Sequence, residues 1–158
     1  MNCKVLLSFL LLAFLVSCSS DDDICLSGEA TPRLKMKFKT QATGKLKTLD
    51  SVFVKVDYGN GPIAVIANKV PTDSLLIPLR VDDAPATRVF VGLSRATVTS
   101  EVKINYTTSS EYVSPACGIR KIYKNVLAEV PAPAEVRAVE QLQNEITDEN
   151  KTHLYLLF

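Results

Sequence analysis

Four cysteines and one histidine are the side chains of this 158-residue chain best suited to covalent or acid–base chemistry. The thiols could be acylated, pair as disulfides or act as nucleophiles, and the imidazole could act as a general base; they belong to Cys3, Cys18, Cys25, Cys117 and His153. The sequence has no Gly-rich phosphate loop, zinc-type Cys/His spacing, metalloprotease motif or serine-hydrolase motif. We therefore expect a protein that is not an enzyme and has no cofactor.

The first 17 residues are typical of a secretory signal. Lys4 supplies a positive charge, and Val5 to Val16 form a nearly unbroken apolar run that is short for a permanent membrane span. Leu15-Val16-Ser17-Cys18 then resembles the bacterial lipobox, in which small or apolar residues precede a cysteine whose sulfur receives diacylglycerol. The sequence predicts cleavage of residues 1–17 and lipidation of Cys18. An ordinary signal peptide with an accidental cysteine is the alternative.

A polar segment follows the predicted lipid anchor, and residues 18–29 are expected to form an extended tether. Its serine-plus-acidic run resembles the export signal of surface lipoproteins in the Bacteroidota, and it consists of Ser19, Ser20, Asp21, Asp22 and Asp23. We expect an outer-membrane protein that is lipid-anchored and exposed on the surface. A periplasm-facing location is the alternative, because any acidic tether would hold a domain away from anionic lipid.

Two cysteines remain once the signal and the lipid are accounted for. Cys25 and Cys117 lie 92 residues apart in an exported chain, so an intramolecular disulfide is the default expectation. The alternative is a nucleophilic thiol at Cys117 assisted by His153. We favour a structural or surface role for His153, because the sequence indicates no partner for a general base.

The charges of the chain argue against two classes of partner. Loss of residues 1–17 removes Lys4 alone among the charged residues and leaves 17 of each sign. A nucleic-acid partner is therefore not expected, since it would need a basic face. A metal is not expected either, because neither Asp21–Asp23 nor Asp82-Asp83 has the spacing of a calcium-binding loop.

From residue 30 onward, apolar and polar residues alternate with the period of β-strands. The first run alternates Leu34, Met36 and Phe38 with three lysines, Lys35, Lys37 and Lys39, which we expect to protect an exposed strand from edge-to-edge pairing. Further strands are predicted around Val52–Val56, Ile63–Ala67, Asp73–Val81, Val89–Leu93, Val102–Tyr106, Ile119–Val130 and His153–Phe158. Asn60-Gly61 indicates a hairpin turn.

Two segments qualify this pattern. Asp73–Val81 has an apolar face of Leu75, Ile77, Leu79 and Val81, but Pro78 lacks an N–H and confines the strand to an edge or a bulge. Residues 134–143 contain helix formers, with Val136, Val139 and Leu142 near one helical face, yet they follow two prolines. We favour a strand for 134–143, with a helix as the alternative.

The number and spacing of these strands predict an all-β domain over residues 30–158. An antiparallel β-sandwich of seven or eight strands is expected, with an immunoglobulin-like arrangement favoured although no Trp is present. A small closed barrel is the alternative.

Several motifs resemble an uncharacterised family of Bacteroidota outer-membrane lipoproteins, classed as a domain of unknown function. They are the lipobox cysteine, Asp22-Asp23-Ile24-Cys25, Thr31-Pro32-Arg33-Leu34 and Glu111-Tyr112-Val113-Ser114-Pro115-Ala116-Cys117-Gly118. The resemblance implies an exported lipoprotein with two paired cysteines and no assigned activity.

Together, these observations predict a non-catalytic binding or assembly module of the cell envelope. Its expected partners are the lipid bilayer, through acylated Cys18, and an outer-membrane protein. A structural envelope lipoprotein without a discrete ligand site is the first alternative, and an enzyme of unknown class is the second.

Overall fold

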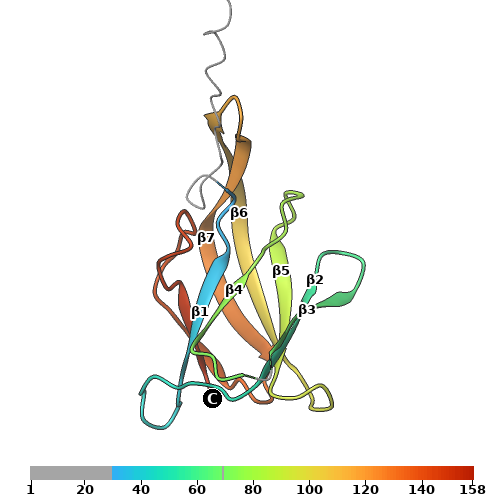
Figure 1. Ribbon diagram of the computed structural model, residues 1–158, viewed down its shortest axis with the longest axis vertical. Helices are drawn as coiled ribbons and strands as arrows, with labels where there is room; N and C mark the ends of the chain where they lie inside the picture. The colour runs from blue at the N-terminus through green and yellow to red at the C-terminus, as the bar shows by residue number, and fades with distance from the viewer. Residues whose placement is uncertain (1–29, 69) are drawn as a thin grey trace, which may run out of the picture.

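A computed structural model describes residues 30–68 and 70–158 and shows an all-β domain (Figure 1). Its nine strands are β1 (Leu34–Lys39), β2 (Val52–Asp57), β3 (Pro62–Asn68), β4 (Ser74–Ile77), β5 (Ala86–Gly92), β6 (Ser100–Ser114), β7 (Gly118–Ala132), β8 (Ala138–Gln141) and β9 (Leu154–Leu157). In these two ranges no helix is long and apolar enough to cross a membrane. The predicted fold class is confirmed, with nine strands in place of seven or eight.

The strands form two sheets. The first sheet has the order β4-β1-β9-β8, and the second sheet has the order β3-β2-β5-β6-β7. The strand pairs are antiparallel except for β1 and β9, which run parallel. The predicted β-sandwich is confirmed. The immunoglobulin-like arrangement is not, because β1 lies between β4 and β9, whereas the first strand of an immunoglobulin domain lies beside the second.

The core fills the space between the sheets and is built from alternate residues of each strand. In β1, Leu34, Met36 and Phe38 are fully buried, while the lysines between them are half-buried. Val54 and Val56 of β2 are also fully buried and enter the core from the second sheet. Because strand side chains alternate between faces, a period of two in the sequence places one apolar face of each strand in the core.

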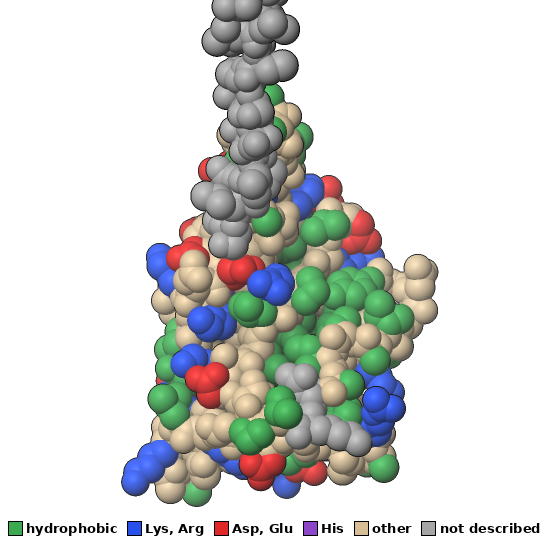
Figure 2. Space-filling view, in the orientation of Figure 1, with side chains coloured by type: hydrophobic (Ala, Val, Ile, Leu, Met, Phe, Trp, Pro, Cys, Tyr) green, Lys and Arg blue, Asp and Glu red, His purple; other side chains and the backbone are tan. Residues whose placement is uncertain are grey.

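The two long sides of the sandwich differ. Beside β7 and β8 it is closed: the Gln141 side-chain amide donates to the Val126 carbonyl, and backbone bonds of 2.8 and 3.2 Å join Tyr123 and Ile146. On the opposite side, β3 and β4 are the edge strands, and a shallow cavity of about 390 Å³ lies between them. Apolar side chains gather on this open side in Figure 2.

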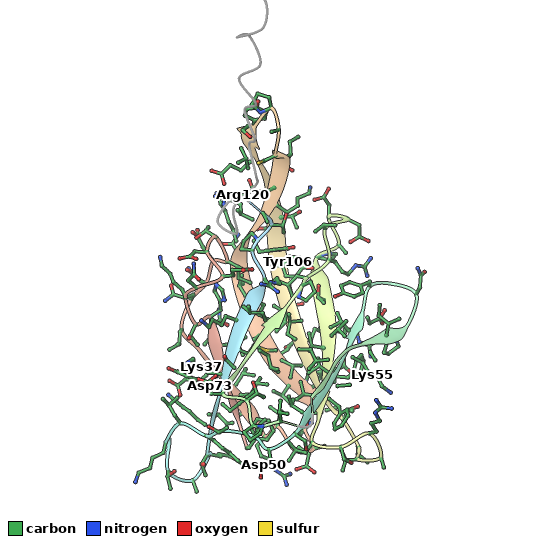
Figure 3. All side chains as sticks on the ribbon, viewed as in Figure 1. Lys37, Asp50, Lys55, Asp73, Tyr106 and Arg120 are labelled. Atoms are coloured by element: carbon green, nitrogen blue, oxygen red, sulfur yellow. The ribbon has the colours of Figure 1, made fainter. Side chains whose placement is uncertain are left out.

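The lysines of β1 do not have the predicted edge-protecting role, because β1 is an inner strand of the first sheet. Lys37 lies 3.3 Å from Asp73, and Lys39 lies 2.8 Å from Glu140. Figure 3 labels Lys37 and Asp73, which lie next to each other. These lysines therefore form cross-strand ion pairs on the outer face of the sheet.

The strand boundaries test the predictions for residues 73–81 and 134–143. β4 is an edge strand that ends at Ile77, directly before Pro78, as predicted. Beyond the strand, Leu79 is buried as the alternation predicts, but the alternation wrongly predicts that Val81 faces the core, since Val81 is 54% exposed. Residues 134–143 contain β8, so the strand interpretation of that segment is confirmed.

Strands β6 and β7 form a hairpin that projects beyond the sandwich (Figure 1). Each strand has 15 residues, more than the alternation around Val102–Tyr106 predicts. Gly118 begins the return strand with a φ of 69°, a conformation that glycine adopts without steric cost. Register shifts along the pair accommodate the bend of this long ribbon.

Candidate binding site

Most of the predicted modification sites lie outside the described residues. This applies to Cys18, Cys25 and the Ser19–Asp23 segment, so lipidation, the disulfide and the export signal stay predictions. Cys117 lies at the end of the β6–β7 hairpin, where its N–H donates to the Ser114 hydroxyl at 3.1 Å. The structure therefore places one predicted site residue at the far end of a protruding element.

His153 lies directly before β9 and is 2% exposed. Its Nδ1 accepts a hydrogen bond of 2.9 Å from the N–H of Lys35, and its own N–H donates to the Lys35 carbonyl at 2.9 Å. Burial lowers the pKa of the imidazole, which keeps the ring neutral at pH 7. These contacts give His153 a structural role in joining β1 to β9.

The neighbouring carboxylates of Asp82 and Asp83 are bound by cations of the protein itself. Two bonds from the Arg80 guanidinium lower the pKa of Asp82 to about 2. Asp83 accepts bonds of 2.6 Å from both Lys121 and Thr108, which lower its pKa. Within residues 30–68 and 70–158, no group of three His, Cys, Asp or Glu side chains is arranged to hold a metal ion.

The candidate site is a groove of about 580 Å³ on the flank of the second sheet. Residues of β2, β3 and the loop from β5 to β6 line it: Phe53, Val54, Lys55, Ala64, Ile66, Ala67, Ser94, Arg95, Thr97, Val98 and Thr99. The lining thus combines an aromatic ring, aliphatic side chains, hydroxyl groups and two cations. Such a mixture of apolar surface with few polar groups is typical of small-ligand sites.

Phe53 forms the apolar wall of this groove. Its cross-strand neighbours are Ala67 in β3 and Gly92 in β5, two residues too small to cover its ring. The Arg95 guanidinium lies over the ring, 5.9 Å from its centroid. This cation–π contact holds the positive charge beside the apolar wall.

The electrostatics of the groove are one-sided. Lys55 and Arg95 are both basic, and none of the described residues that line the groove carries a carboxylate. Figure 3 shows Lys55 on the flank formed by β2 and β3. On the same sheet, by contrast, Arg88 is bound by Glu101 at 2.7 Å and by Asp57 at 3.6 Å. The groove therefore presents positive charge that the described acidic residues do not neutralise.

The loop that forms the outer wall depends on Gly92. A Cβ at this position would lie 3.2 Å from Thr97 Oγ1 and 3.2 Å from Thr99 Cγ2. Ser94 and Thr97 fix the loop above it, since each backbone N–H bonds the other residue's hydroxyl, at 3.2 and 3.1 Å. The absence of a side chain at residue 92 is what lets the loop fold against the sheet.

The fold and this groove define a class: a two-sheet all-β domain with a small basic and apolar surface site. The model of a family of unknown function, DUF6452, matches residues 51–158, and the chain belongs to that family. The match includes every segment that lines the groove. No curated protein and no solved structure matches the chain.

The sequence alone does not predict the groove. Its residues come from the neighbouring strands β2 and β3 and from a loop about 30 residues later, and none of these segments forms a motif. One weak signal was present, because an isolated glycine in a strand pattern often marks a close approach of another segment. Gly92 ends β5 and marks such an approach.

Proposed function

We propose that this chain is an exported lipoprotein, held on the outer membrane by acylated Cys18, that acts as a non-catalytic binding or assembly module. The apolar N-terminal run and the lipobox-like Leu15-Val16-Ser17-Cys18 support the anchor. The acidic Ser19–Asp23 segment supports display on the outer face of that membrane.

The groove beside Phe53 is the observation that carries the binding role. Its two cations have no carboxylate partner among the described residues, and an aromatic ring and aliphatic side chains lie next to them. This arrangement favours an anion with an apolar body, such as an aromatic carboxylate or the acidic and apolar side chains of a partner protein. The Ser94 and Thr99 hydroxyl groups can donate further hydrogen bonds to the same anion, whereas that of Thr97 already donates to the Ser94 carbonyl at 3.1 Å.

The position of the groove suits a tethered module. Figure 1 shows the β5–β6 loop and the tip of the β6–β7 hairpin at opposite ends of the domain. Thr31, near the start of the described chain, accepts a bond of 3.0 Å from the N–H of Lys121 on that hairpin. Because the tether joins the domain at the hairpin end, the groove lies at the opposite end, away from the tether.

A ligand pair that differs only in charge tests the binding role. We expect 2-naphthoate to bind saturably to a chain that starts at residue 19, and the neutral 2-naphthamide to bind at least ten-fold more weakly. Arg95→Ala and Lys55→Ala should each weaken naphthoate binding several-fold, because each removes one charge from the groove. Lys45→Ala, which removes an exposed lysine outside the groove, is the matched control.

Calorimetric or fluorescence titration distinguishes the outcomes. Equal affinity for the acid and the amide would contradict the electrostatic site. Loss of naphthoate binding in the Lys45→Ala control to the same extent as in Arg95→Ala would show that net charge, and not the groove, determines binding. Absence of saturable binding to either compound favours a structural lipoprotein without a discrete ligand site.

A further inference from the structure

The end of the β6–β7 hairpin exposes two large apolar side chains that face each other. Tyr112 and Ile119 are direct cross-strand partners, so both side chains lie on the same face of the ribbon. They are 66% and 68% exposed. The opposite face of the ribbon carries Glu111 and Arg120, joined at 2.8 Å. The hairpin tip, defined as residues 111–120, is therefore an amphipathic ribbon end.

The start of the described domain lies beside this hairpin. Thr31 is bonded to Lys121, only two residues after Ile119. Cys18 precedes Thr31 by 13 residues, which can extend over at most about 45 Å. The predicted Cys25–Cys117 bond would attach the tip to a residue seven positions after Cys18, a span of about 25 Å when fully extended. The tether therefore joins the domain at the end that carries the hairpin tip, which is the end closest along the chain to the predicted lipid.

We propose that the hairpin tip inserts Tyr112 and Ile119 into the headgroup region of the bilayer that holds the lipid anchor. A tyrosine ring suits this region, since its body is apolar and its hydroxyl can stay in contact with water. The inference rests on the proposed lipidation of Cys18. It adds a second contact with the membrane and a fixed orientation of the domain.

Two residues would not hold a soluble protein on a bilayer, but they can orient one that is already tethered. The lipid anchor makes contact of the tip with the bilayer an intramolecular event, so a weak interfacial preference is sufficient. β6 spans 15 residues and rises by about 45 Å between the tip and the groove loop. The inserted orientation therefore holds the groove well away from the lipid.

The absence of tryptophan from the chain makes a direct test possible. Full-length lipidated protein carrying Tyr112→Trp is reconstituted in phosphatidylethanolamine–phosphatidylglycerol vesicles whose acyl chains are brominated. We expect the indole emission to shift to the blue and to lose at least half of its intensity relative to unbrominated vesicles. Val98→Trp, at an exposed site in the groove loop, is the matched control and should keep its intensity.

A second variant separates a native contact from one created by the probe. Ile119→Asp in the Tyr112→Trp chain should abolish the quenching, because it places a charge in the inserted face. Unquenched emission from Tyr112→Trp protein that floats with the vesicles would overturn the inference and leave the lipid anchor intact. Equal quenching of the Tyr112→Trp and Val98→Trp proteins would also overturn it, since the domain would lie flat. Protein without the mass of a lipid would refute the proposed anchor and this inference together.

Discussion

Lys35 and His153 are joined by two hydrogen bonds of 2.9 Å, in which the imidazole Nδ1 accepts from the Lys35 N–H and the Lys35 carbonyl accepts from the His153 N–H. The side chain thus supplies an acceptor at the point where the parallel pairing of β1 with β9 begins. Nδ1 can accept this bond only while it is unprotonated. The contact makes the stability of the first sheet sensitive to the protonation of one residue.

We predict that His153 dominates the pH dependence of stability between pH 7 and pH 5.5. Burial lowers the pKa of the folded imidazole, whereas the unfolded residue titrates near 6.5. The unfolded state therefore binds a proton that the folded state does not, and the free energy of unfolding falls as the pH drops below about 6.5. The slope for this single proton cannot exceed about 1.4 kcal/mol per pH unit, and the direction of the change is a loss of stability as the pH falls.

His153→Asn is the variant that checks this prediction, because the chain has one histidine. Urea denaturation should show a variant that is less stable at pH 7 and whose stability barely changes down to pH 5.5. A wild-type profile that is already flat over this range would contradict the prediction.

Loss of the hydroxyl group should lower the stability of the domain at one tyrosine of a packed pair and not at the other. The rings of Tyr106 and Tyr123 pack edge to face at 4.9 Å, and both residues are buried. The Tyr106 hydroxyl bonds Thr87 at 2.6 Å, whereas that of Tyr123 has no partner among the described residues. Tyr106→Phe should cost about 1–2 kcal/mol of unfolding free energy, and Tyr123→Phe should be neutral or stabilising by up to about 1 kcal/mol.

Denaturant unfolding of the two variants under one set of conditions gives the comparison directly. Each variant removes one oxygen from the same ring pair, so each controls for the other. An equal loss of stability in both would show that the Tyr123 hydroxyl is hydrogen-bonded in solution.

Gly92→Ala should disturb the groove more than it disturbs the domain. The added methyl group would press on Thr97 and Thr99, and the loop must move by a few tenths of an ångström or more. We expect naphthoate affinity to fall several-fold while the unfolding free energy falls by about 1 kcal/mol. Adding Thr99→Ser removes the Cγ2 that the new methyl group meets, and the double variant should recover part of the affinity. Unchanged binding in Gly92→Ala would indicate that the loop does not shape the site.

The general architecture could be predicted because it follows from alternation along single strands. The burial of Leu34, Met36 and Phe38 can be predicted from the sequence, since one face of a strand must be apolar to enter the core. The inner position of β1 in its sheet cannot be predicted in this way, because it depends on pairing with β9, which lies more than 100 residues later. For the same reason, the three lysines of β1 (Lys35, Lys37 and Lys39) wrongly predict an edge strand.

The groove could not be predicted, since its chemistry arises from proximity. Phe53 and Arg95 are ordinary residues in the sequence and become a site only when the β5–β6 loop folds over β2. The predicted lipid anchor is the reverse case. Its signal is entirely local, and it lies outside the described residues.

The predicted Cys25–Cys117 bond should stabilise the domain strongly. A closed loop of 92 residues corresponds to about 4–5 kcal/mol in the chain-entropy description, an upper figure because strain in the folded state subtracts from it. Intact mass after alkylation, with and without prior reduction, detects the bond, and urea unfolding with and without reductant measures its effect. Two freely alkylated thiols in protein from the native envelope would contradict the prediction.

Metabolic labelling with an alkyne-bearing fatty acid tests the membrane anchor most directly. Lipidation of Cys18 predicts that the full-length protein takes up the label, partitions into the detergent phase and loses both properties in Cys18→Ala. Cys3→Ala should leave labelling unchanged, since that residue precedes the predicted cleavage site. A wild-type protein that is exported but stays unlabelled and aqueous would contradict the anchor, and with it the orientation inferred for the hairpin tip.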